Sequence, residues 1–136
     1  MGRIRTKEEL QACHHLFTRA WAELSDQPFA PDYDQLEAML RDERTLFYVG
    51  DIGFYGFIIN EHFFTGRRVA AVITLWIEPQ ERGTFRAGRF IAGLFKAAKD
   101  MGGEEITFTV AAHSPLVDSW ETHFGAPSDL VFVRDL

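Results

Sequence analysis

The stretch ERGTFRAGR places Arg82, Arg86 and Arg89 beside Gly83 and Gly88, at the start of an amphipathic pattern. The first turn of a helix has backbone N–H groups without intrahelical partners, and the helix dipole adds about half a positive charge there. Glycine lets a backbone approach a ligand closely, and the arginine guanidinium matches phosphate oxygens in bidentate fashion. The stretch therefore predicts a binding site for phosphate or another anion.

A second interpretation of these arginines stays open. Arginines on the first turn of a helix are also found solvated, or paired with carboxylates such as Glu78 and Glu81. Arg82, Arg86 and Arg89 are spaced i, i+4 and i+7, so they share one face if the helix extends back to Arg82. Two known phosphate loops are excluded, because the stretch has neither Gly-Lys-Ser/Thr nor the dinucleotide-binding glycine spacing.

The basic segment lies within an acidic chain. The 136 residues carry a formal net charge of −6, whereas residues 67–99 alone carry +5. This middle segment either balances charge across the fold or holds an anion. The acidic total argues against nonspecific nucleic-acid binding, so we expect no nucleic acid as a partner.

Length and composition predict one globular domain over residues 1–136, because the chain is too short for a second full core. No apolar stretch approaches the roughly 20 residues that span a bilayer, and the charged N-terminus lacks the apolar part of a secretory signal. We therefore expect a cytoplasmic protein without a membrane partner.

The chain's cysteine and its paired histidines indicate no redox or metal chemistry. Cys13 is the single cysteine and cannot form an internal disulfide, and its position in an apolar helical stripe predicts a buried structural thiol. His14 and His15 are adjacent, so they diverge by about 100° on a helix and make a poor metal pair. We expect no metal site.

The first part of the chain predicts two helices, over residues 6–24 and 34–41. Thr6 and Glu9 have the spacing of a capping box at the start of the first helix. The runs TLFYVG, FYGFIIN and RVAAVITLWI are rich in β-branched and aromatic residues and predict three strands. The third run is almost wholly apolar, which is typical of a central strand covered on both faces, and Pro79 ends it.

The second part predicts a helix over residues 86–101, a strand EEITFTV, a short helix over residues 115–123 and a last strand DLVFVRDL. The whole order predicts an α+β fold with one mostly antiparallel sheet and helices on both faces. The strand–helix–strand step over residues 69–110 predicts a parallel strand pair joined by a right-handed crossover. The edge of the last strand invites pairing between subunits, so a homo-oligomer or a larger assembly stays open.

The whole chain resembles a GCN5-related N-acetyltransferase (GNAT) domain. In that family an apolar central strand runs into a proline, an Arg/Gln-x-x-Gly-x-Gly/Ala loop and an amphipathic helix, and LWIEPQERGTFRAGRFIAGLF occupies this place here. The family's first strand and helix are similar to RIRTKEELQACHHLFTRAW. Its later strand, short helix with a Gly-Phe-like turn, and final strand are similar to ITFTV, SPLVDSWETHFGAP and DLVFVRDL.

The resemblance implies an acyl-CoA-dependent N-acetyltransferase that moves an acetyl group from acetyl-CoA to a small-molecule or protein amine. Its loop cradles the pyrophosphate with backbone N–H groups, and a nearby Arg89 extends toward a phosphate. The resemblance places the pantetheine arm along the end of the central strand. The matching positions in this chain are Arg82, Gly83, Thr84, Phe85, Arg86, Ala87 and Gly88 for the loop, and Leu75, Trp76 and Ile77 for the strand.

The acid and base of the reaction are less clearly marked. Glu78 is a candidate base, although a charge beside Pro79 more often faces solvent. The family often has a tyrosine on the short helix that protonates the leaving thiolate, and this chain has none there. His123 is the candidate proton donor in place of that tyrosine. The alternative is that His123 is a surface or packing histidine.

Phe85 is the second departure from the family pattern, because its bulky ring stands at the family's second glycine.

Three candidate functions therefore remain. The first is the N-acetyltransferase. The second is a catalytically silent GNAT-like structural or binding protein, for example a phage virion component, since THFGAPSDLVFVRDL resembles such proteins. The third is an unrelated α+β domain that uses the basic segment for another anionic partner.

Overall fold

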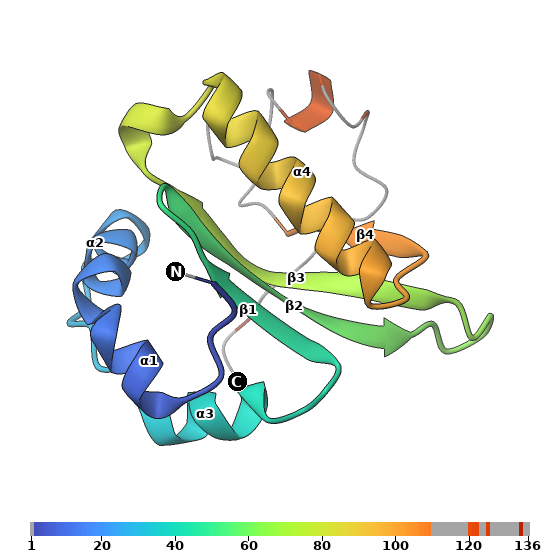
Figure 1. Ribbon diagram of the computed structural model, residues 1–136, viewed down its shortest axis with the longest axis horizontal. Helices are drawn as coiled ribbons and strands as arrows, with labels where there is room; N and C mark the ends of the chain where they lie inside the picture. The colour runs from blue at the N-terminus through green and yellow to red at the C-terminus, as the bar shows by residue number, and fades with distance from the viewer. Residues whose placement is uncertain (1, 110–119, 123–124, 126–133, 135–136) are drawn as a thin grey trace.

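The computed structural model describes residues 2–109, 120–122, 125 and 134. Its described strands form one sheet in the order β1-β2-β3-β4 (Figure 1). β1 (Thr45–Val49), β2 (Gly53–Glu61) and β3 (Arg68–Ile77) are antiparallel neighbours, whereas β4 (Glu105–Thr107) lies parallel to β3. The mostly antiparallel sheet and its parallel strand–helix–strand step are confirmed.

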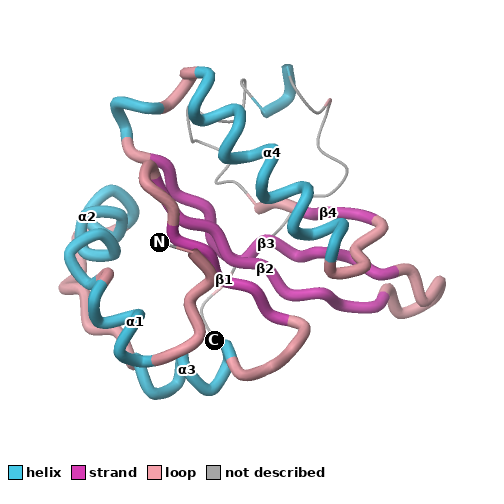
Figure 2. The backbone as a smooth tube through the Cα atoms, in the orientation of Figure 1, coloured by secondary structure: helices cyan, strands magenta, loops and turns pink. Residues whose placement is uncertain are grey.

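Helices cover both faces of this sheet (Figure 2). α1 (Lys7–Ala12), α2 (His14–Leu24) and α3 (Tyr33–Leu40) pack on one face, and α4 (Phe85–Asp100) crosses the other. The alternation of side chains along β1 and β2 sends successive residues to the two faces. The fold is therefore the expected α+β arrangement of helices around a single described sheet.

The N-terminal helix is interrupted, which differs from the continuous helix expected over residues 6–24. Thr6 and Glu9 form the expected capping box, with the Glu9 N–H donating to Thr6 Oγ1 at 3.2 Å. At Cys13 the N–H donates to the Leu10 carbonyl at 3.0 Å, which tightens the last turn and separates α1 from α2. Cys13 is fully buried at this junction, and the expected buried thiol is confirmed.

Two apolar clusters form the core, one on each face of the sheet. The cluster beneath α1–α3 contains Phe17, Phe54 and Trp76, with the Phe17 and Phe54 rings 5.2 Å apart in an edge-to-face contact. The cluster beneath α4 contains Phe57 and the fully buried Leu94. β3 therefore carries side chains that pack into both clusters.

β3 lies between β2 and β4, as expected for a central strand, but it is less covered than its sequence predicts. The register with β2 shifts between Gly56 and Phe57, so that Thr74 and Val72 are their partners and Ile73 is the extra residue. Ile73 is 46% exposed. The bulge changes which face of the sheet the residues after it point to. Val72 and Leu75 both pack toward α4 although they are three residues apart, and Trp76 packs toward α2.

The C-terminal elements are described only in part. β4 covers three residues of the strand expected at EEITFTV. Residues 120–122 are helical, and Gly125, at a positive φ of 84°, donates its N–H to the Glu121 carbonyl at 2.9 Å, as a helix C-terminus does. The rest of the expected short helix and the last strand DLVFVRDL lie outside the described residues. In the part of the chain that is described, no helix is both long and apolar enough to cross a membrane.

Candidate functional site

The connection from β3 to α4 forms a compact turn. After β3 ends, a single 3-10 turn (Pro79–Glu81) carries proline at its first position. Gly83 then adopts a positive φ of 77°, a conformation that favours glycine. Thr84 caps α4, because its Oγ1 accepts from the Ala87 N–H at 3.3 Å. The helix therefore begins at Phe85, one residue before the expected start.

Several backbone amides of this turn have no hydrogen-bond acceptor in the part of the chain that the structure describes. The Arg82 N–H donates to the Pro79 carbonyl and the Thr84 N–H to the Glu81 carbonyl, at 3.3 Å and 3.2 Å. Among the described residues, nothing accepts from the N–H groups of Gly83, Phe85 and Arg86. Amides of this kind at the first turn of a 16-residue helix are donors for an anion.

Phe85 does not block this turn. Its side chain is 80% exposed and points away from the core. A Cβ atom added at Gly83 or Gly88 would meet no heavy atom within 4 Å, so space is open beside both glycines. The bulk of Phe85 at the family's second glycine therefore leaves the backbone of the turn accessible.

The arginines of this turn have different partners. Arg82 donates from Nε to the Ile77 carbonyl at 2.9 Å and forms an ion pair with Glu23 on α2 at 2.7 Å. Arg86 forms an ion pair with Glu81 at 2.8 Å. Arg89 makes no ion pair with any described residue, and its guanidinium lies 6.0 Å from the centroid of the Phe85 ring. The condition for one face shared by all three arginines is not met, because α4 begins after Arg82.

At the end of β3, beside this turn, one edge is not paired with any strand of the described residues. β4 pairs with β3 only at residues 69–71, although β3 continues to Ile77. Beyond Ala71, no described strand pairs with the side of β3 that faces away from β2. Leu75 packs toward α4 at this edge and Trp76 toward α2, while the Ile77 carbonyl is taken by Arg82. Of the described strands, none therefore competes with an extended ligand for residues 72–76.

Glu78 is buried at the junction between β3 and the turn, at 8% exposure, and does not face solvent as a charge beside Pro79 usually does. Its carboxylate forms an ion pair with Arg19 on α2, and its N–H donates to the Ile52 carbonyl at 2.7 Å. The Arg19 guanidinium lies 5.5 Å from the centroid of the Trp76 ring. The Glu78 carboxylate is therefore held by a cation between α2 and β3.

The Trp76 ring carries a buried hydrogen-bond donor. Its Nε1 atom is buried and makes no hydrogen bond within the described residues. An unpaired buried N–H group costs about 1–3 kcal/mol. The indole is packed against Phe54, with ring centroids 5.8 Å apart.

The fold is shared with solved acetyltransferase structures, although no family model and no curated protein sequence matches the chain. An acetyltransferase from Trypanosoma brucei superposes with a TM-score of 0.71 at 16% identity, over 100% of this chain and 99% of that one. An aminoglycoside acetyltransferase from an uncultured soil metagenomic sample, in complex with sisomicin, gives a TM-score of 0.71 at 12% identity, over 98% and 91%. The ribosomal-protein-alanine N-acetyltransferase of Brucella melitensis gives 0.61 at 20% identity, over 92% and 93%.

The chain has the GNAT fold. The expectation drawn from the sequence motifs is confirmed for the architecture. At sequence identities of 12–20%, the structural similarity shows the fold alone. The reaction has to be inferred from the residues of the site.

The expected acid of this GNAT fold lies outside the described residues, since nothing is described at His123 or at most of the short helix. Trp120 is described on that helix, and its ring centroid lies 4.7 Å from that of Phe108, which follows β4. No group of three or more His, Cys, Asp or Glu side chains in the described ranges is arranged to hold a metal ion.

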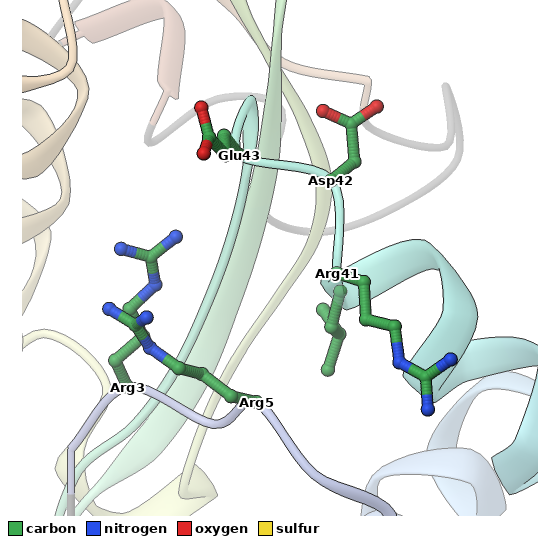
Figure 3. A pocket seen from close by; sticks show the side chains of 6 residues that line it. Arg3, Arg5, Arg41, Asp42 and Glu43 are labelled. Carbon is green, nitrogen blue, oxygen red and sulfur yellow. The ribbon is translucent and has the colours of Figure 1, made fainter.

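Two hollows in the described surface lie away from the turn before α4. One of about 330 Å³ is lined by Arg3, Arg5, Leu40, Arg41, Asp42 and Glu43. Figure 3 shows the guanidinium groups of Arg3 and Arg5 beside each other and Arg41 pointing away from them. Burial, and secondly Arg5, lower the pKa of Arg3, whose Nη2 donates to the Thr45 carbonyl at 3.0 Å. The other hollow, about 790 Å³, is lined by Trp21 of α2, by residues 28–32 of the α2–α3 loop and by α3.

Sequence reasoning missed the residues of α2 at this site. Arg19 and Glu23 are separated by 59 residues from Glu78 and Arg82, their respective partners. Nothing local in the sequence indicates these pairs, because both depend on how α2 packs against the end of β3. The two hollows also lie beside segments whose sequence indicates only turns and helix ends.

Proposed function

We propose that this chain is an acyl-CoA-dependent N-acetyltransferase that transfers an acetyl group from acetyl-CoA to an amine. The observation that supports it most is that the N–H groups of Gly83, Phe85 and Arg86, at the start of α4, have no acceptor among the described residues. The turn also follows the part of β3 that no described strand pairs with on one side, which supports a diphosphate at the turn and an extended arm along that edge. The single domain covers residues 1–136, and we place it in the cytoplasm.

In this proposal the turn binds the diphosphate of acetyl-CoA, and the end of β3 binds its pantetheine arm. The diphosphate accepts hydrogen bonds from the free amides, and the charge of Arg86 and Arg89 favours it further. The turn formed by Arg82, Gly83 and Thr84, together with Ala87 and Gly88 in the first turn of α4, keeps that backbone in place. The pantetheine arm lies along the edge of β3 at Leu75, Trp76 and Ile77.

The chemistry is the displacement of a thiol by an amine. The thioester supplies an activated acetyl group: the amine nitrogen bonds to its carbonyl carbon, the carbon–sulfur bond breaks, and the thiolate leaves with the electron pair. The nitrogen loses one proton and the thiolate gains one, so the products are an N-acetyl amine and the free thiol. We assign the first proton to Glu78, through a water molecule, and the second to His123. The acceptor is a small-molecule or protein amine.

A second candidate function is a GNAT-like protein that does not catalyse transfer, as a structural or binding component, for example of a phage virion. The Arg19–Glu78 ion pair favours it, because it gives the Glu78 carboxylate a structural role that joins α2 to the end of β3. The exposed Phe85 ring favours it too, since it offers a contact surface at the position of a glycine in the family.

The test is thermal unfolding with and without acetyl-CoA. A ligand at about 100 times its dissociation constant stabilises the folded chain by roughly 2.7 kcal/mol, so the melting temperature rises clearly. The variant Arg86→Glu places a negative charge beside the free amides and is expected to lose this rise. Arg41→Glu is the matched control, because Arg41 also forms an exposed ion pair, with Glu37 at 3.0 Å, on α3.

Each outcome decides between the two functions. A rise in the wild type and in Arg41→Glu, but not in Arg86→Glu, supports binding at the turn. Turnover of acetyl-CoA with a panel of amines then distinguishes the enzyme from the silent module. No rise in the wild type, at millimolar acetyl-CoA, would contradict both the proposed site and the proposed reaction.

A further inference from the structure

The extended segment before α1 places two arginines at the hollow of about 330 Å³. This segment runs beside β1, where the Ile4 N–H donates to the Phe47 carbonyl at 2.8 Å. Successive side chains of an extended segment alternate in direction, and Ile4, at 4% exposure, points to the core. Arg3 and Arg5 therefore point to the other side, and Figure 3 shows their guanidinium groups beside each other.

These two like charges lie together without a carboxylate. Neither arginine forms an ion pair with a described residue. Arg3 is partly buried, and its Nη2 donates to the Thr45 carbonyl at 3.0 Å, which holds the guanidinium at the hollow. Burial, and secondly the charge of Arg5, lower the pKa of Arg3. An anion between the two guanidinium groups would relieve their repulsion.

The loop between α3 and β1 supplies the other charged residues of the hollow. Its turn is fixed by the Arg44 N–H, which donates to the Asp42 carboxylate at 2.9 Å. Two of its lining residues are already compensated, because Asp42 pairs with Arg44 and Arg41 pairs with Glu37, at 3.0 Å each.

Glu43 differs from these neighbours on the same loop. It lines the hollow but forms no ion pair within the part of the chain that the structure describes. In Figure 3 its carboxylate lies on the same side of the view as the guanidinium groups of Arg3 and Arg5, whereas Arg41 points away from them. The described charges of the hollow that lack an ion pair are therefore two positive and one negative.

A small ligand that matches these charges carries two negative groups and one positive group. An α-amino acid with an acidic side chain has this set, as two carboxylates and one ammonium. Guanidinium groups bind carboxylates through charge-assisted hydrogen bonds, and an ammonium donates to a carboxylate. A volume of about 330 Å³ lies at the small end of the roughly 300–1,000 Å³ of ligand sites, which fits a free amino acid.

We propose that the hollow lined by Arg3, Arg5 and Glu43 binds a free acidic α-amino acid such as glutamate. The two carboxylates of the ligand accept hydrogen bonds from the guanidinium groups of Arg3 and Arg5. The ligand's ammonium donates to the Glu43 carboxylate. A simple anion satisfies the arginines but leaves Glu43 as a repelling charge, so the site selects the amino acid over a dicarboxylate or a phosphate.

This site is separate from the turn before α4 and does not depend on the proposed function. Thr45, whose carbonyl holds Arg3, pairs with Ile58, and Ile58 pairs with Ala71 of β3. The turn before α4 follows the other end of β3, at Ile77. The amino acid therefore binds toward the opposite end of the sheet from the candidate acetyl-CoA site.

The test is calorimetric titration of the full chain with L-glutamate, glutarate and inorganic phosphate. Glutarate has the two carboxylates of glutamate without its ammonium, so the wild type should bind it about tenfold more weakly than L-glutamate. Glu43→Gln should weaken L-glutamate about tenfold without weakening glutarate. Arg5→Gln should weaken both ligands about tenfold, because it removes a guanidinium that each of them uses.

Arg41→Gln is the matched control, since Arg41 lines the same hollow but points away and pairs with Glu37. It should leave both affinities unchanged. Melting temperatures of all variants check that each chain is folded. The rise of melting temperature with acetyl-CoA should be the same in Arg5→Gln as in the wild type, so the two proposals fail or stand separately.

Three results would overturn the amino-acid site. The first is no binding of L-glutamate by the wild type at millimolar concentration. The second is binding of glutarate or phosphate as tight as that of L-glutamate, because it would show a surface that attracts any anion. The third is equal weakening by Arg41→Gln and Arg5→Gln, because it would show an effect of net charge alone.

Discussion

Glu78 is the residue that best distinguishes the two candidate functions, the N-acetyltransferase and the protein that does not catalyse transfer. Its carboxylate is buried and paired with Arg19, and along the chain it lies directly between β3 and the turn before α4. A base in this position has the guanidinium of Arg19 as a fixed neighbour. The same pair also joins α2 to the sheet, so a structural role has to be separated from a chemical one.

Variants of the two partners separate these roles. We expect Glu78→Gln and Arg19→Gln each to lower the free energy of unfolding by about 1–2 kcal/mol, because each removes a charged hydrogen bond. If Glu78 is the base, Glu78→Gln lowers the turnover rate with an amine by about 10²–10⁴-fold, whereas Arg19→Gln keeps the carboxylate and most of the rate. Urea unfolding and initial rates measure both effects. Equal rate losses in the two variants would contradict the assignment of the base.

Tyr55 provides a pH-dependent contribution to stability. Burial, and secondly Tyr48, raise the pKa of Tyr55 from 10.0 to about 12. The Tyr48 and Tyr55 rings are stacked with centroids 5.1 Å apart on the α4 face of the sheet. The folded chain therefore keeps the phenol proton at a pH where the unfolded chain has lost it.

The sign of the effect follows from proton binding. Between about pH 10 and pH 12 the unfolded state binds fewer protons, so the free energy of unfolding falls as pH rises. We expect a total loss of up to about 2.7 kcal/mol from this residue, which Tyr55→Phe does not show. Urea unfolding of both chains across this range measures the difference. If the free energy of unfolding fell equally with pH in the wild type and in Tyr55→Phe, the assignment of this pH dependence to Tyr55 would be contradicted.

At the scale of elements, local sequence signals predicted most of the fold. The capping box of Thr6 and Glu9, the alternating strands and the amphipathic pattern of α4 are all encoded within a few residues. The turn at residues 82–88 was predicted for the same reason, since glycine, the capping threonine and the arginines are contiguous. Observed bounds of α3 and α4 differ from the expected ones by one residue.

Features that depend on packing between distant elements were not predictable. The break at Cys13 depends on how α1 and α2 fit against the core, and no glycine or proline marks it. The bulge at Ile73 and the early end of the β3–β4 pairing depend on register between strands. The Arg19–Glu78 and Glu23–Arg82 pairs join residues far apart in sequence, so the partners of the candidate base and of the turn came only from the structure.

At the scale of the whole molecule, the β2–β3 hairpin ends in an exposed aromatic pair. Phe63 and Phe64 are 91% and 86% exposed, and their ring centroids lie 5.0 Å apart. Figure 1 shows this hairpin tip at one end of the molecule, far from α2 and from the turn before α4. Neither ring contributes to the two core clusters.

We expect the double variant Phe63→Ser/Phe64→Ser to leave the free energy of unfolding within about 0.5 kcal/mol of the wild type, because surface substitutions away from special features change little. Removal of the exposed apolar area should lower association at high concentration. Urea unfolding and static light scattering measure these effects. Phe57→Ser is the contrasting control, since Phe57 is fully buried. Stability loss in the double variant comparable to that of Phe57→Ser would contradict the prediction.

The paired contacts of α2 with the far end of β3 affect how the chain can be shortened. Arg19 and Glu23 lie on one helix, and their partners Glu78 and Arg82 flank the turn that precedes α4. A version trimmed to begin after Leu24 would expose the Glu78 carboxylate and release the side chain that braces the Ile77 carbonyl. Ligand binding measured on such a fragment would describe a rearranged turn. Binding should therefore be measured on a chain that keeps the N-terminal helices.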